Sequence, residues 1–114
     1  MKLDTFTKAY IEAIIFTECH CDNPELDGKT FEDFSDDAKQ KIIADCEKFQ
    51  SENDLTDYPS KNAGHDFWLT RNHHGCGFWE NDFGNEEQCK KLTESAHKFG
   101  EQYVYCGDNG KVYL

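Results

Sequence analysis

The residues best able to do chemistry gather in one stretch, residues 63–79. AGHDFWLTRNHHGCGFW holds three histidines, a cysteine, an arginine and two tryptophans. Thiolate and imidazole are the ligands that zinc prefers, and a thiol beside an imidazole can be activated as a nucleophile. The stretch therefore raises two chemical hypotheses, a zinc site and a thiol-dependent active site.

The zinc hypothesis draws on a second group of donors earlier in the chain. A site would combine residues from two loops: Cys19, His20, Cys21, His73, His74 and Cys76. Against it, the chain has no Cys-x-x-Cys knuckle, and the spacings Cys-x-Cys and His-His-x-Cys are not those of common structural zinc sites. We therefore expect no cofactor, and zinc is kept as the alternative.

The thiol hypothesis places Cys76 beside His73, His74 or His65, between two glycines whose backbone could donate to an oxyanion. Catalytic pairs are usually assembled from distant segments, so closeness in sequence is weak support. Histidines near a turn are more often solvated surface residues. We therefore expect a protein that is not an enzyme and has no catalytic residue.

Three helices are predicted from apolar residues that recur at helical spacing, over 5–17, 36–51 and 86–99. Ser35 precedes two aspartates and is a helix-start signal, and Asn85 precedes Glu-Glu-Gln in the manner of a capping box. Polar segments with proline and glycine connect these helices and are expected to be loops.

Two β-hairpins are predicted between and after these helices. Residues 65–72 alternate apolar and polar side chains, and after a turn over NHHG the chain returns through 76–80. Residues 102–106 and 111–114 flank GDNG, a turn rich in residues that tolerate positive φ.

The expected fold class is therefore α+β. Two N-terminal helices precede a β-hairpin, a helix and a second β-hairpin, and a four-stranded, mainly antiparallel sheet has helices packed on one face. Residues 1–114 are expected to form a single domain.

Strand geometry makes the first hairpin a candidate binding surface. Phe67 and Trp68 are successive and would point to opposite faces of the sheet. If one of the two rings is buried in the core, the other must lie on the exposed face. Arg71 would pair with a nearby carboxylate such as Glu80 or Asp82, and if buried it would be structural. The hairpin residues expected to contact a partner are Trp68, Arg71, His73 and His74.

The charge of the chain is strongly negative and uneven. The formal net charge is −11, and up to Asp57 there are 15 acids against 6 lysines, whereas 8 acids and 6 bases follow. Such a charge repels nucleic acid and anionic membranes, so neither is an expected partner. The density of acids is highest over residues 22–37, where Lys29 is the only base. The acids of this run are Asp22, Glu25, Asp27, Glu32, Asp33, Asp36 and Asp37.

Most charge runs are solvated faces that keep a protein soluble. A folded array of carboxylates can also stand in for the phosphates of DNA, about one charge per 1.7 Å of duplex axis, and occupy the basic groove of an enzyme that handles nucleic acid. The acidic run is therefore a second candidate surface for a protein partner.

The N-terminus indicates where the protein works. Acidic and polar residues interrupt its apolar run and no small-residue cleavage site follows, so we expect neither a signal peptide nor a membrane span. The expected location is the cytoplasm, where six cysteines stay reduced.

Four segments carry a resemblance to a known family: FTKAYIEAIIFTE, IIADCEKFQSEN, GHDFWLTRNHHGCGFWENDFGN and YVYCGDNGKVYL. The chain resembles a group of small, uncharacterised proteins encoded by tailed bacteriophages and phage-derived sequences. The turn of that family usually reads RNGHGAGFW, so this chain has His73 where the family has a glycine and Cys76 where the family has an alanine. The Cys19-His20-Cys21 cluster is outside the family pattern, which weakens the zinc and thiol hypotheses.

The resemblance implies a function only indirectly. Small, acidic phage proteins that are not enzymes often act on a host protein, many by blocking a nucleic-acid-handling defence enzyme such as a CRISPR effector or a restriction enzyme. The resemblance thus favours an inhibitor or modulator of a host protein inside the infected bacterium, with DNA mimicry as one way in which it would act. The alternatives are a small zinc-binding or Cys/His-dependent protein, and an accessory protein that binds a phage partner or itself.

Overall fold

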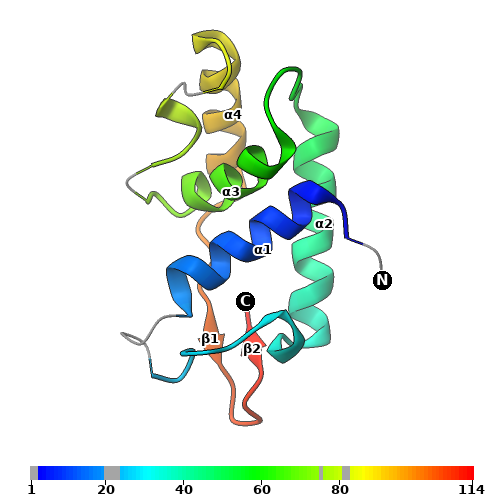
Figure 1. The fold of residues 1–114 in the computed structure, drawn as a ribbon, viewed down its shortest axis with the longest axis vertical. Coiled ribbons are helices and arrows are strands. Elements are labelled where there is room, and N and C mark those ends of the chain that lie inside the picture. Colours follow the sequence, from blue (N-terminus) through cyan, green and yellow to red (C-terminus); the bar gives the residue numbers. More distant parts are fainter. Residues whose placement is uncertain (1–2, 20–23, 75, 81–82) are drawn as a thin grey trace.

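A computed structural model describes residues 3–19, 24–74, 76–80 and 83–114 (Figure 1). The elements, in chain order, are α1 (Thr5–Glu18), η1 (Phe31–Asp33), α2 (Asp36–Glu52), α3 (Ser60–Arg71), η2 (Phe78–Glu80), α4 (Glu86–Lys98), β1 (Tyr105–Cys106) and β2 (Val112–Tyr113), where η marks a 3₁₀ helix. In Figure 1, α1 and α3 run side by side across the middle of the molecule, and α2 stands along one flank. The short β1–β2 hairpin and α4 lie at opposite ends of the molecule.

The expected four-stranded sheet is wrong. The described residues are mostly helical, and their sheet contains two strands, β1 and β2. The stretch expected to form the first hairpin is instead α3, a turn and η2. The physical reason is burial on nearly every side of α3, where Gly64 and all residues over 67–71 are buried. A helix without a broad solvent face shows no 3.6-residue repeat of polar and apolar side chains, so the apparent two-residue alternation over 65–72 favours a strand in the sequence alone.

The three predicted helices are confirmed, because α1, α2 and α4 begin and end within one residue of the expected bounds. Their start signals also hold: the Ser35 hydroxyl accepts from the Ala38 N–H at 3.1 Å, and the Asn85 side chain accepts from the Gln88 N–H at 2.8 Å. None of the helices formed by the described residues combines the length and apolarity needed to cross a membrane.

The second predicted hairpin is present but short, with Tyr105 opposite Tyr113 and Cys106 opposite Val112. Gly110 sits at φ 78° and its N–H donates to the Gly107 carbonyl at 3.0 Å, which closes the turn. Val112 is fully buried, and its carbonyl accepts from the Ser35 N–H at 2.9 Å. The hairpin is therefore fixed to the segment that leads into α2.

The core is a stack of aromatic rings centred on Phe49 of α2. Its ring centroid lies 4.2 Å from that of Phe67, 5.6 Å from that of Phe78 and 5.9 Å from that of Phe6, each in stacked geometry. Offset stacks of this kind are worth about 0.5–1.5 kcal/mol each beyond the area they bury. The stack joins α1, α2, α3 and η2.

Gly64 sets the distance between α1 and α3. A Cβ atom at this position would lie 2.0 Å from the carbonyl oxygen of Phe6 and 3.0 Å from the Cβ of Ala9. The nearest obstacle is backbone, which cannot rotate away as a side chain would. Only glycine allows the two helices to approach this closely.

We expect Gly64→Ala to destabilise the protein by about 1–3 kcal/mol, because α1 and α3 must separate. Helix propensity alone would change stability by about 1 kcal/mol in the opposite direction. Urea unfolding measures the sign, with Lys61→Ala on the exposed side of α3 as the control, expected within about 0.5 kcal/mol of the parent. Stabilisation by Gly64→Ala would contradict the close crossing.

Candidate protein-binding surface

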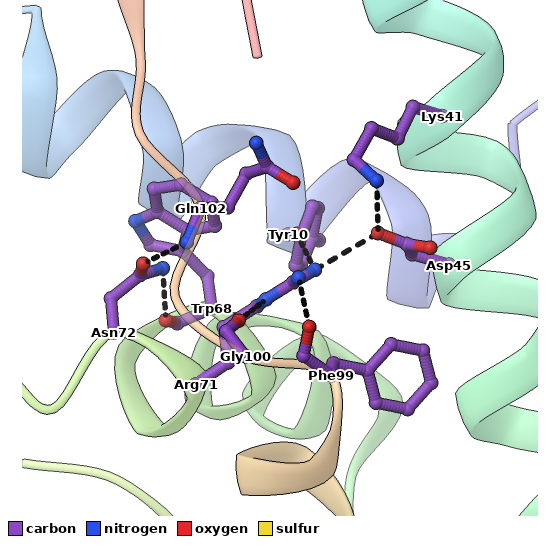
Figure 2. A network of polar contacts seen from close by, with 9 residues as sticks. All are labelled: Tyr10, Lys41, Asp45, Trp68, Arg71, Asn72, Phe99, Gly100 and Gln102. Atoms are coloured by element: carbon purple, nitrogen blue, oxygen red, sulfur yellow. Dashed lines mark hydrogen bonds and ion pairs between the residues drawn. The ribbon is translucent and has the colours of Figure 1, made fainter.

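The arginine of the chemistry-rich stretch lies at the centre of a buried polar network (Figure 2). Arg71 ends α3 and is 2% exposed. Its Nη1 donates to the Asp45 carboxylate at 2.9 Å and to the Tyr10 hydroxyl at 3.1 Å. Its Nε and Nη2 donate to the carbonyls of Gly100 and Phe99 at 2.9 and 3.1 Å.

This network corrects the expected role of Arg71. Its carboxylate partner is Asp45 of α2 instead of Glu80, while Asp82 lies outside the described residues. Burial raises the pKa of the nearby Tyr10 hydroxyl despite the opposing positive charge of Arg71, so the phenol stays protonated at neutral pH. Arg71 therefore holds α1, α2, α3 and the end of α4 together, and is structural.

Trp68 is also in the core, contrary to its expected place on a hairpin surface. It is fully buried, and its indole N–H donates to the Thr17 hydroxyl of α1 at 2.8 Å. Other polar residues of the stretch serve the fold in the same way. The Thr70 hydroxyl accepts from the Phe78 N–H at 3.0 Å, and the Asp66 carboxylate accepts from the Tyr58 hydroxyl.

The two turn histidines remain accessible. His73 is exposed at φ 55°, and its ring stacks on that of His97 with centroids 4.6 Å apart. Its Nε2 lies 3.9 Å from a carboxylate oxygen of Glu101. His74 is half-buried. Of the four residues expected to contact a partner on this side, only the histidines have exposed surface to offer.

The zinc donors do not come together in the part of the chain that the structure describes. Among these residues, no group of three or more histidine, cysteine, aspartate or glutamate side chains could hold a metal ion. His20 and Cys21 lie outside the described residues. Burial, followed by the negative charges of Glu18 and Asp33, raises the pKa of the Cys19 thiol, which disfavours the thiolate that zinc requires.

Cys76 lacks the environment of an activated nucleophile. Partial burial raises the pKa of its thiol, and the negative charges of Glu80 and Asp66 raise it further. Catalytic thiols lie in positively charged surroundings that lower the pKa. None of the five described cysteines forms a disulfide with another.

The acidic run is largely open to solvent in the part of the chain that the structure describes. We call Glu25, Asp27, Glu32, Asp33, Asp36 and Asp37 the acidic segment. Five of its side chains are exposed and that of Asp33 is half-buried, whereas Asp22 lies outside the described residues. No ion pair within 4.0 Å joins these six acids to a base among the described residues. In Figure 1 the chain carrying them passes beside the β1–β2 hairpin and enters the lower end of α2.

Sequence reasoning missed a second open surface, around Trp79. This tryptophan lies on η2 and is 48% exposed, so it is the exposed tryptophan of the stretch in place of Trp68. A groove of about 330 Å³ beside it is lined by Trp79, Glu86, Lys90, Thr93 and Glu94. The i, i+4, i+8 spacing of Glu86, Lys90 and Glu94 places them on one face of α4, but only the tertiary structure brings Trp79 there.

We expect Arg71→Met to destabilise the protein by about 3–5 kcal/mol, because it removes the buried ion pair with Asp45 at 2.9 Å and leaves only the longer, exposed contact with Lys41. Lys41→Ala is the matched control, since Lys41 is an exposed base 3.9 Å from the same carboxylate, and its loss should cost at most about 1 kcal/mol. Urea unfolding of both variants measures the difference. Similar effects for the two would contradict the central role of Arg71.

We expect Cys76 to react with iodoacetamide more slowly at pH 7 than a free thiol of ordinary pKa, since only the thiolate attacks. Peptide mass spectrometry across pH 6–10 would follow Cys76 separately from the other cysteines. Glu80→Gln should shift the pH–rate curve of Cys76 to lower pH by removing one negative charge, while Glu12→Gln should not, because Glu12 is not among the charges that raise the pKa of Cys76. Half-maximal reactivity below pH 8 would restore the thiol hypothesis.

Comparison of the chain with protein-family models, with curated proteins and with solved structures found no match.

Proposed function

We propose that the protein is an acidic binding module that engages the basic, nucleic-acid-binding surface of a partner protein and thereby inhibits or modulates it. The observation that carries this proposal is the acidic segment, whose exposed carboxylates have no ion-pair partner among the described residues. Unpaired carboxylates attract a basic groove without first breaking an internal ion pair.

The single base within the segment does not neutralise it. Lys29 directs its ammonium group to the carbonyl of Gly110 at 2.8 Å, where it anchors the β1–β2 turn. Hydrogen bonding from the Thr30 N–H, the largest influence, holds the pKa of Asp33 below its ordinary value, with smaller contributions from Lys29 and Lys111. The field of the segment is therefore negative at neutral pH, and such a field speeds association with a basic surface.

The backbone beneath these carboxylates is well anchored. Leu26 and Phe34 are each 1% exposed, so the segment is fixed to the core on both sides of η1. The Ser35 cap fixes the first turn of α2, which carries Asp36 and Asp37. Anchored carboxylates lose less conformational entropy on binding than a flexible acidic tail would lose.

The resemblance to small phage proteins suggests a bacterial host protein as the partner. A host enzyme that handles nucleic acid, such as a defence nuclease, has the basic groove that this surface suits. The rival zinc and thiol functions have less support, because the described donors are dispersed and the pKa of Cys76 is raised.

Capture from bacterial lysate on the immobilised protein, followed by elution with a short DNA duplex, tests the proposal. We expect a captured protein that the duplex displaces and that dissociates as salt is raised, because both treatments compete with charge contacts. A segment variant with Glu25→Gln, Asp27→Asn, Glu32→Gln, Asp36→Asn and Asp37→Asn should reduce capture roughly tenfold or more. Asp33 is left unchanged because it receives the Thr30 N–H.

The matched control changes five exposed acids outside the segment: Glu12→Gln, Glu47→Gln, Glu52→Gln, Glu87→Gln and Asp108→Asn. Both variants have the same net charge, so a difference between them identifies the surface. Equal loss in both would mean that only net charge matters. Capture that DNA cannot displace would refute competition for a nucleic-acid site.

A further inference from the structure

The groove beside Trp79 has one wall fixed by η2. Phe78, the neighbour of Trp79, is fully buried against the ring of Phe49, and its N–H donates to the Thr70 hydroxyl. The Glu80 carboxylate accepts from the Gly77 N–H at 3.1 Å and closes the same turn. This anchoring holds Trp79 at the surface, and no other ring or cation among the described residues stacks on its indole.

The other wall is the outer face of α4. Glu86, Lys90, Thr93 and Glu94 line the groove, whereas Cys89, Leu92 and Ala96 of the same helix are buried. Lys90 forms no ion pair within 4.0 Å among the described residues, although the adjacent Lys91 pairs with Glu87 at 3.3 Å. The groove thus offers an indole, two carboxylates and one ammonium group.

This combination suits a cationic side chain. An indole face attracts cations more strongly than any other side-chain ring, and a planar, weakly hydrated guanidinium can stack on it while its edge donates to carboxylates. A volume of about 330 Å³ accommodates one long side chain. An anionic guest would instead face both Glu86 and Glu94.

We propose that the Trp79 groove receives an arginine side chain presented by the partner protein. This inference rests on the proposed function, since a partner with a nucleic-acid-binding surface is rich in arginine, and it adds a specific contact on an element distinct from the acidic segment. Exposed tryptophan and arginine are also the residues over-represented at energetically dominant interface positions.

The two tryptophans make the inference directly measurable. Trp68 is fully buried and Trp79 is 48% exposed, so acrylamide quenching of tryptophan fluorescence reports mainly on Trp79. A tetra-arginine peptide should protect this fluorescence, and a tetra-lysine peptide should protect it less, because ammonium groups do not stack. Binding is then followed by calorimetry for the variants, including Trp79→Leu, which lacks the reporter.

The signs of three charge variants are the sharpest expectation. Glu86→Gln and Glu94→Gln should each weaken tetra-arginine binding several-fold, whereas Lys90→Gln should strengthen it, because Lys90 competes for the same carboxylates. Trp79→Leu should weaken binding about tenfold. The controls are Glu12→Gln for loss of one charge and Tyr103→Leu for loss of an exposed ring, and circular dichroism checks that each variant is folded.

The outcomes separate this inference from the proposed function. If Lys90→Gln weakened peptide binding and Glu86→Gln and Glu94→Gln strengthened it, the groove inference would be overturned in favour of an anionic guest. Equal effects of the groove variants and the control variants on tetra-arginine binding would also overturn the groove inference. The proposed function would still hold if the acidic-segment variant lost capture of the lysate protein. Groove-dependent peptide binding without any DNA-displaceable partner would support the groove and refute the proposed function.

Discussion

The buried guanidinium of Arg71 is the constraint on which the rest of the structure depends. A buried charge is tolerated only when it is paired and its donors are satisfied, and here the acceptors come from three separate parts of the chain. Tyr10 belongs to α1, Asp45 to α2, and the carbonyls of Phe99 and Gly100 to the end of α4. The aromatic stack around Phe49 supplies apolar burial, which depends little on direction. The guanidinium instead has five N–H donors in a fixed geometry, so its acceptors must lie at defined positions. The position of α3 is therefore fixed by polar geometry as well as by packing.

The fixed end of α3 decides what reaches the surface after it. The Thr70 hydroxyl, one residue before Arg71, receives the Phe78 N–H and so ties η2 to α3. A Cβ at Gly77 would lie 2.3 Å from the same hydroxyl, which leaves no room for any other residue at that turn. With Phe78 directed into the core, the adjacent Trp79 is left facing solvent beside α4. The exposed indole is thus a consequence of the buried network.

Sequence signals were sufficient where structure is decided locally, and insufficient where it is decided by distant contacts. Ser35 and Asn85 cap their helices with their own side chains, so α2 and α4 were predicted from short windows. The acidic segment lies within thirteen residues of sequence, 25–37, so it could be recognised without the tertiary structure. By contrast, α3 is surrounded by other elements and shows no amphipathic period, and the partner of Arg71 lies 26 residues away in α2. The groove could not be foreseen, because it needs Trp79 and α4 to meet.

The residue types that perform chemistry are also those that satisfy a polar core, and burial separates the two uses. Arg71, Thr70, Asp66 and Trp68 each have an internal hydrogen-bond partner, so each contributes to the fold. Among the described residues, the groups without such a partner include the five exposed carboxylates of the acidic segment and the indole of Trp79. Carboxylates and an indole share one chemical preference, which is for cations. The two proposals, made on different elements, therefore call for the same class of guest.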